Sequence, residues 1–142
     1  MILITKLDKP YMEQEKINFI VEYNHNQGLE IKETTEALEA WGYTEEEKAQ
    51  AEKERIAKLF LTGADVERGI YQAKGMDFDD ILSYVTQAQP EGLDIKALKI
   101  ELKANHFYRG NPYVNAVGQL LGFTEEQLDA FFEDGNYEHL LA

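Results

Sequence analysis

The charged stretch TEEEKAQAEKERIAKLF, residues 44–60, divides the chain into two differently patterned parts. Glu, Lys, Ala and Gln are strong helix formers, and bulky apolar residues appear here only at the end, at Ile56, Leu59 and Phe60. We therefore predict a charged linking helix over residues 44–61, whose first half is exposed and whose second half enters a core. The 142 residues of the chain suffice for one core and a small appendage.

The preceding part, residues 1–43, predicts a small β-α-β-β unit. Alternation over residues 2–7 favours a strand, and a following apolar stripe favours a helix that covers a small antiparallel sheet with the turns around Ile17 to Val21. That stripe consists of Met12, Ile17, Ile20 and Val21. Alternation at Leu29 and Ile31 then favours a hairpin. Residues 34–41 are compatible with its second strand or with a helical turn, and the sequence leaves that choice open.

Residues 62–142 predict a bundle of about five short helices, so the fold class is α+β and mainly α. Each predicted helix begins at a residue type that commonly caps a first turn: Thr62, Asp77, Asp94, Asn111 and Thr124. The third of these helices is predicted to carry Phe107 on its buried side. The helical period places eight residues in the core: Ile70, Ile81, Val85, Leu98, Leu102, Val117, Leu128 and Phe131.

Two similar stretches, WGYTEEE at residues 41–47 and LGFTEEQ at residues 121–127, raise the question of a repeated functional motif. Both match a capping box, in which Thr44 or Thr124 caps a helix. We predict a positive φ at the preceding glycines, Gly42 and Gly122. Overlaying Gly75 on Gly122 also aligns a weak repeat of one helix hairpin. Nothing similar follows the two caps, so the stretches indicate a shared way of starting a helix and no shared function.

Recognisable catalytic patterns are absent from the sequence. His25, His106 and His139 stand apart without metal-ligand spacing, and the DFDD stretch at residues 77–80 lacks the Gly and Glu of an EF-hand loop. The chain has no cysteine, no phosphate-binding loop, no nucleophile elbow and no dinucleotide-binding fingerprint. We therefore predict that the protein is not an enzyme and that it has no catalytic residue, no cofactor and no metal.

The charge balance argues against nucleic acid as a partner. The chain has 27 carboxylates and 14 Lys and Arg residues, for a net charge of −13, whereas affinity for phosphate comes from clustered cations. The stretch VGQLLGFTEEQLDAFF has helix-turn-helix spacing, but its second predicted helix carries no Lys or Arg. It carries five carboxylates: Glu125, Glu126, Asp129, Glu133 and Asp134. We also expect no membrane association, because no apolar run is long enough to span a bilayer.

Three longer stretches carry a family resemblance: EYNHNQGLEIKETTEAL, AEKERIAKL and YRGNPYVNAVGQLLGFTEEQLDAFF. They resemble small proteins encoded in the tail modules, the tail-fibre and baseplate region, of phages and prophages of Gram-positive bacteria. Some of those proteins have a longer insert before the charged helix, where this chain is short. The resemblance implies a non-enzymatic tail-fibre or baseplate accessory, or an assembly factor. It would act in the cytoplasm of the bacterial host or be incorporated in the virion tail.

The acidic composition leaves a second function class open, a phage decoy that mimics DNA and inhibits a host nucleic-acid enzyme. Such a decoy needs carboxylates spaced like phosphates along one face. The acids that follow Thr44 are interrupted by Lys48, Lys53 and Arg55. These interruptions favour the tail-associated function.

A candidate interface follows from the junction between the two parts of the chain. It consists of Trp41, Tyr43, Ile56, Leu59 and Phe60. Interfaces are enriched in Trp, Tyr and Phe, so we predict that these residues contact a protein partner, such as a phage tail component, or a second copy of the chain. The alternative is that Trp41 packs the two parts of the chain together.

Overall fold

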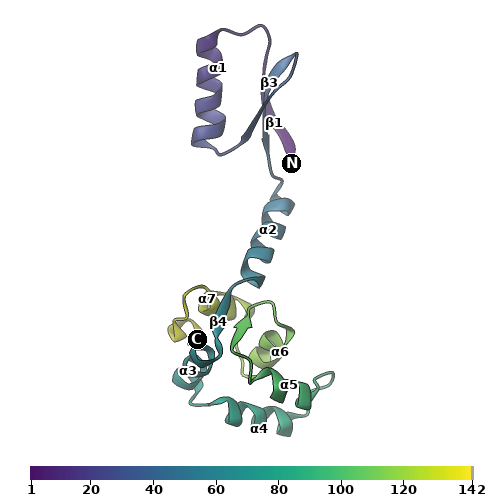
Figure 1. Ribbon diagram of the computed structural model, residues 1–142, viewed down its shortest axis with the longest axis vertical. Helices are drawn as coiled ribbons and strands as arrows, with labels where there is room; N and C mark the ends of the chain where they lie inside the picture. The colour runs from purple at the N-terminus through teal and green to yellow at the C-terminus, as the bar shows by residue number, and fades with distance from the viewer. Residues whose placement is uncertain (142) are drawn as a thin grey trace. The chain divides into compact units, whose positions relative to one another are not determined.

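The computed structural model describes residues 1–141, and its elements follow the change of pattern in the sequence (Figure 1). The chain divides into two units, Met1–Glu52 and a second that begins at Lys53. The division falls within helix α2 (Glu45–Ala57), which buries none of its residues. The predicted fold class, α+β and mainly α, is confirmed.

The N-terminal unit contains a three-stranded antiparallel sheet. Its strands are β1 (Ile2–Asp8), β2 (Glu30–Glu33) and β3 (Ala37–Gly42), in the order β1-β3-β2. Residues 37–42 are therefore a strand, which answers the question that the sequence left open. The register places Leu7 opposite Leu38 and Ile31 opposite Ala40.

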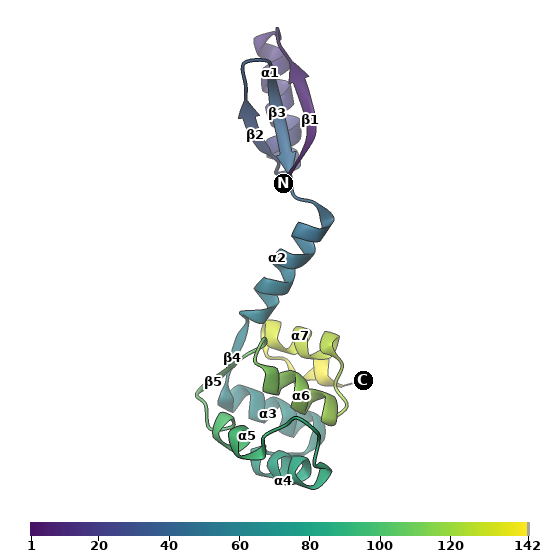
Figure 2. The same ribbon diagram turned by 90° about the vertical axis from the view of Figure 1, so that its right-hand side faces the viewer.

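One face of this sheet is covered by α1 (Glu13–Ile20) and its π-helical continuation η1 (Val21–Asn26) (Figure 2). The predicted apolar stripe is wrong in three of its four positions, because Met12, Ile17 and Val21 are exposed. The helix instead turns Phe19, Ile20 and Tyr23 toward the sheet. The rings of Phe19 and Tyr23 lie 4.7 Å apart, and burying two aromatic side chains removes more apolar surface from water than burying Ile17 and Val21 would.

Gly42 does not have the positive φ that the sequence predicted, whereas Gly122 does, with φ of 86°. Gly42 is the last residue of β3 and is buried. A Cβ atom at this position would lie 2.8 Å from Leu29 Cδ2. Gly42 is therefore closely packed against the side chains of Leu29 and Ile4.

The second unit contains five α-helices and a short antiparallel ribbon (Figure 1). The helices are α3 (Gly63–Lys74), α4 (Phe78–Ala88), α5 (Ile95–Glu101), α6 (Pro112–Leu120) and α7 (Glu125–Asp134), followed by a 3-10 turn, η2 (Tyr137–Leu140). All five predicted caps accept a hydrogen bond from a backbone N–H of the first turn. The ribbon pairs β4 (Phe60–Thr62) with β5 (His106–Tyr108) and was not predicted.

The eight predicted core residues all lie in or against the core of this unit. Six are buried, and Ile70 and Leu102 are half-buried against them. The placement of Phe107 on the third helix of the bundle is wrong, because α5 ends at Glu101 and Phe107 enters the core from β5. After the helix, the Asn105 carbonyl accepts a hydrogen bond from the Gly63 N–H over 2.8 Å, next to the first pair of the ribbon.

The predicted hairpin repeat corresponds to α3–α4 and α6–α7. Gly75 and Gly122 both have positive φ, and both second helices begin with a capping box.

Over residues 1–141, none of the helices combines the length and the apolar character needed to cross a bilayer.

Candidate interaction surfaces

The β4–β5 ribbon presents aromatic side chains to solvent. Leu61 and Phe107 are paired across it and turn inward to the core, so their neighbours turn outward. Phe60 is 58% exposed and Tyr108 is 48% exposed. Their ring centroids are 5.8 Å apart, and His106 lies 5.7 Å from Phe60 and 5.2 Å from Tyr108. We call Phe60, His106 and Tyr108 the aromatic cluster.

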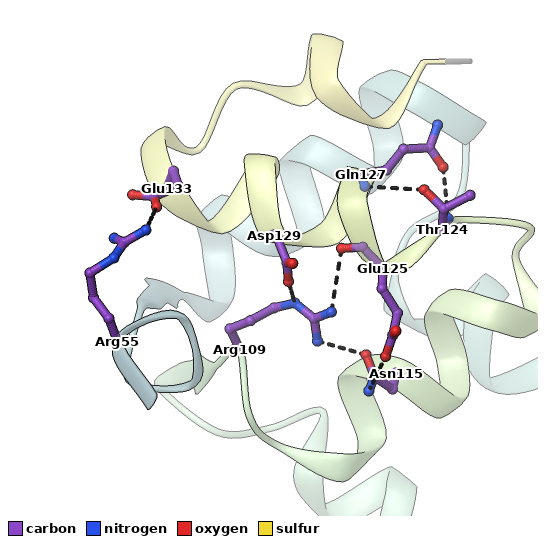
Figure 3. Close-up of polar contacts among 8 residues, drawn as sticks. All are labelled: Arg55, Arg109, Asn115, Thr124, Glu125, Gln127, Asp129 and Glu133. Carbon is purple, nitrogen blue, oxygen red and sulfur yellow. Dashed lines mark hydrogen bonds and ion pairs between the residues drawn. The ribbon is translucent and has the colours of Figure 1, made fainter. Parts of the chain in front are cut away.

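Arg109 fixes the strand that carries two of these rings (Figure 3). Its buried guanidinium donates through Nε to Asp129 Oδ1 over 2.7 Å and through Nη1 to Asn115 Oδ1 over 2.6 Å. Nη2 also donates to the Glu125 carbonyl over 3.5 Å. One side chain thus joins the end of β5, next to Tyr108, to α6 and α7.

Three of the predicted interface residues belong to this unit, and they have different surroundings. Leu59 is half-buried against the core, and its carbonyl accepts from the Arg109 N–H over 2.7 Å. Ile56 is half-buried near the end of α2. Only Phe60 is well exposed, as part of the aromatic cluster. Its neighbours His106 and Tyr108 were missed, because the three-residue HFY stretch is too short to show the period of a strand.

The other two predicted interface residues belong to the N-terminal unit. Trp41 is half-buried in the central strand, opposite Leu3 of β1 and Glu30 of β2. Its Nε1–H donates to Glu39 Oε1 over 3.1 Å, and the Lys32 ammonium lies 5.0 Å from its ring centroid. Tyr43, just after the strand, is exposed.

A groove of about 650 Å³ lies at this end of the sheet. Trp41, Gly42 and Tyr43 line it together with the beginnings of β1, β2 and α2; the other lining residues are Met1, Ile4, Asn24, Gln27, Gly28, Leu29, Glu30 and Lys48. Of the five predicted interface residues, Trp41 and Tyr43 belong to the N-terminal unit, and Ile56, Leu59 and Phe60 belong to the second unit.

The start of α2 is fixed by a capping box, as predicted. The Thr44 N–H donates to Glu47 Oε1 and the Glu47 N–H donates to Thr44 Oγ1, both over 3.1 Å. The α-amino group of Met1 lies 2.8 Å from Glu47 Oε2. Its hydrogen bond, followed by that of the Thr44 backbone, holds the pKa of the Glu47 carboxyl below its usual value. This carboxylate therefore serves a local structural role.

The carboxylates of α7 also have local partners. Asp129 pairs with Arg109 and Glu133 pairs with Arg55 (Figure 3). Asp134 pairs with His139. The Asn136 backbone N–H and then the His139 side chain hold the pKa of Asp134 below its usual value. Asn115 Nδ2 also donates to Glu125 Oε1 over 3.3 Å. Four of the five acids of α7 therefore have a partner within the protein.

No catalytic or metal-binding arrangement stands out in the described part of the chain. Among residues 1–141, no three His, Cys, Asp or Glu side chains are grouped to hold a metal ion. The core of the second unit contains an apolar cavity of about 60 Å³, lined mainly by aliphatic and aromatic side chains such as Ile81, Leu98 and Phe131. Ligand pockets usually measure about 300–1,000 Å³, so this space is core packing and no binding site.

Comparison of the chain with protein-family models, with curated protein sequences and with solved structures found no match.

Proposed function

We propose that this is a non-enzymatic, tail-associated protein of a phage or prophage that acts through protein–protein contacts. In this proposal it is a tail-fibre or baseplate accessory, or an assembly factor for one. It works in the cytoplasm of the bacterial host or enters the virion tail. The sequence resemblance suggests the phage context, and the aromatic cluster is the observation that supports a contact function.

The cluster has the chemistry of an interface centre. Single exposed apolar residues are ordinary, but Phe60, His106 and Tyr108 touch one another on one side of a ribbon. Aromatic residues dominate binding energy when a partner covers them. Because Arg109 fixes the adjoining backbone, the rings are held in place before binding, which lowers the entropy cost of association. Tail components with an apolar recess are the partners that this surface fits.

The decoy alternative gains no support from the arrangement of charge. A DNA mimic needs a continuous row of carboxylates that are not neutralised. On α2, Glu45 lies 3.4 Å from Lys48, and Arg55 pairs with Glu133 of α7. Lys48 therefore lies beside an acid of its own helix, and Arg55 of α2 lies beside an acid of α7. A contact role with a tail component accounts for the aromatic cluster, which a decoy would not use.

Deleting the gene from the phage or prophage that carries it tests the proposal. We expect the deletion to reduce the yield of infectious particles or of complete tails seen by electron microscopy, and the wild-type gene supplied in trans to restore it. A variant with Phe60→Ser and Tyr108→Ser should restore it poorly. The matched control is Tyr71→Ser on α3, which removes another exposed ring, 62% accessible, and should restore it fully.

Two outcomes would overturn the proposal. If the deletion changes neither particle structure nor titre, the protein has no tail function. If the deletion has an effect but the Phe60→Ser/Tyr108→Ser variant complements as well as Tyr71→Ser does, the aromatic cluster is not the contact surface. Circular dichroism of the purified variants checks that each is folded.

A further inference from the structure

Helix α5 and the turn that follows it carry three lysines on one exposed face. Lys96, Lys99 and Lys103 are three and four positions apart, so they lie on the same side of the helix. Ile100 lies among them and is 71% exposed, the largest exposed fraction of the large apolar side chains in residues 1–141. We call these four residues the α5 basic face.

The lysines of this face have no partner among the described residues. The arginines of the same unit each pair with a carboxylate, whereas no carboxylate lies within ion-pair distance of Lys96, Lys99 or Lys103. The two acids closest in sequence are already engaged. Asp94 accepts from backbone N–H groups of the first turn of α5, and Glu101 Oε1 accepts from the Asn111 side chain.

The stability of α5 does not account for this face. Like charges three or four positions apart on a helix repel one another. Lys99 and Lys103 lie near the C-terminal end, where the helix dipole favours a cation, but Lys96 is the second residue of the helix, where the dipole disfavours one. Ile100 leaves most of its apolar surface in water. Anionic and apolar groups bound at this face would relieve both costs.

We propose that the α5 basic face binds an acidic segment of a partner protein, in which carboxylates flank an apolar side chain. The lysines pair with the carboxylates, and Ile100 packs against the apolar side chain. Charge complementarity carries this choice, because the face combines unpaired cations with an exposed aliphatic group. The inference does not depend on the proposed tail function, and the α5 basic face shares no residue with the aromatic cluster.

The surroundings of the face favour a narrow acidic segment over an extended polyanion. Helix α4 lies beside α5 (Figures 1 and 2) and carries Asp79 and Asp80 in its first turn, after the cap Asp77. Duplex DNA or an anionic bilayer extends beyond one short helix and would meet these acids, which repel phosphate. A second copy of the chain has the same net charge of −13 and is repelled as a whole.

The interaction should be weak and local. At physiological ionic strength the Debye length is about 8 Å, so the lysines of the face act on a bound carboxylate more strongly than the distant acids of the chain do. Exposed ion pairs are individually weak. We therefore expect a Kd in the micromolar to millimolar range for a short acidic segment.

NMR titration of the full chain with a synthetic helical peptide, in which glutamates flank one row of leucines, tests the proposal at physiological salt. The amide signals of residues 95–103 should shift most. The triple variant Lys96→Gln/Lys99→Gln/Lys103→Gln should weaken binding about tenfold. The matched control, Lys48→Gln/Lys53→Gln/Lys58→Gln, removes the same charge from exposed lysines on or next to α2. Its affinity should stay within about twofold of wild type.

The apolar part of the contact is tested separately. Ile100→Ser should weaken binding of the peptide about three- to tenfold. Ile17→Ser, at a residue of α1 that is 46% exposed, should leave the affinity unchanged. A peptide with serines in place of its leucines should bind equally to wild type and to Ile100→Ser. Circular dichroism checks that each variant is folded.

Four results would overturn the inference. Residues 95–103 that do not respond to millimolar peptide bind no acidic segment, and equal losses in the two lysine triple variants would show an effect of net charge alone. Tighter binding of duplex DNA or of phosphatidylserine vesicles than of the peptide at residues 95–103 would make the ligand a phosphate surface. Shifts of these signals when the protein alone is concentrated would make a second copy the occupant.

Discussion

Arg109 and Asp129 join the end of β5 to α7 through a charged hydrogen bond, Nε to Oδ1, of 2.7 Å (Figure 3). The arginine side chain is 7% exposed and the aspartate side chain is 35% exposed. Without the carboxylate, the buried guanidinium would be neither paired nor solvated by water. The pair therefore stabilises the fold mainly by avoiding an unpaired buried charge. It also holds the strand that presents His106 and Tyr108.

Replacing Asp129 should therefore destabilise the second unit. We expect Asp129→Ala to lower its free energy of unfolding by about 2–3 kcal/mol, measured by urea unfolding followed through amide signals of α7. The control is Arg68→Ala, which breaks an exposed pair with Asp65 and should cost less than about 0.5 kcal/mol. If both variants unfold at the same urea concentration, the buried pair is no more important than a surface one.

Phe131 is 1% exposed at the centre of the second unit. Phe131→Ala should cost about 3–5 kcal/mol, as for other buried aromatic side chains. Gly69 faces the same ring, and a methyl group at Gly69 would collide with it. Gly69→Ala should therefore also lower the free energy of unfolding of the second unit, by about 1–3 kcal/mol. The loss should be much smaller when Gly69→Ala is made in the Phe131→Ala variant. Additive effects in the double variant, measured by thermal unfolding, would contradict this contact.

The elements with local signals could be predicted from the sequence. Thr62, Asp77, Asp94, Asn111 and Thr124 each begin a helix as expected, because the capping hydrogen bond involves only residues two or three positions apart. The core positions of the second unit followed from the helical period. Such features depend on neighbours in the chain, and these are visible without a structure.

Features that depend on distant residues could not be predicted in this way. The β4–β5 ribbon joins residues more than forty positions apart, and three-residue strands are too short for a clear period. The aromatic cluster exists only through this pairing, so Phe60 was chosen without His106 and Tyr108. Arg109 likewise contacts Asn115 and Asp129 only because the tertiary fold brings these residues together. Gly42 was misjudged because its packing against Leu29 is not local.

The Tyr11–Glu33 hydrogen bond should make the N-terminal unit sensitive to pH at both extremes. The Tyr11 hydroxyl donates to Glu33 Oε1 over 2.6 Å. This bond raises the pKa of Tyr11 from 10.0 to about 12. The same bond, followed by contacts with Lys9 and Lys16, lowers the pKa of Glu33 from its usual 4.5. Each shift links protonation to folding.

The signs of the two effects are opposite. Stability contributed by Glu33 is present above pH 4.5 and is lost as pH falls through its lowered pKa. Stability contributed by Tyr11 is present below pH 10.0 and is lost as pH rises through about 12. NMR titration of the Tyr11 ring should show its pKa fall toward 10.0 in Glu33→Gln. Glu36→Gln, in the same hairpin, should leave it near 12; equal shifts in both variants would rule out a specific bond.

The helix pair α6–α7 should not bind DNA. Its second helix carries five carboxylates and no Lys or Arg, so the phosphate contacts that give non-specific affinity are missing. We expect no mobility shift with duplex DNA at physiological salt. A shift that appears and then weakens steeply as salt rises would overturn this expectation, because that salt dependence is the signature of phosphate contacts.

Trp41→Ala should destabilise the N-terminal unit without changing the mass of the protein in solution. The ring is half-buried on the central strand, opposite Leu3 and with the Lys32 ammonium 5.0 Å from its centroid. Because it is only half-buried, we expect a loss of about 1–2 kcal/mol, below the range for fully buried aromatic residues. Tyr43→Ala removes an exposed ring and should cost less than about 0.5 kcal/mol. Circular dichroism and light scattering on both variants distinguish a packing role of Trp41 from a contact role. Loss of an oligomer without unfolding would make Trp41 part of a contact surface, and a Trp41→Ala variant with unchanged stability and unchanged mass would contradict both roles.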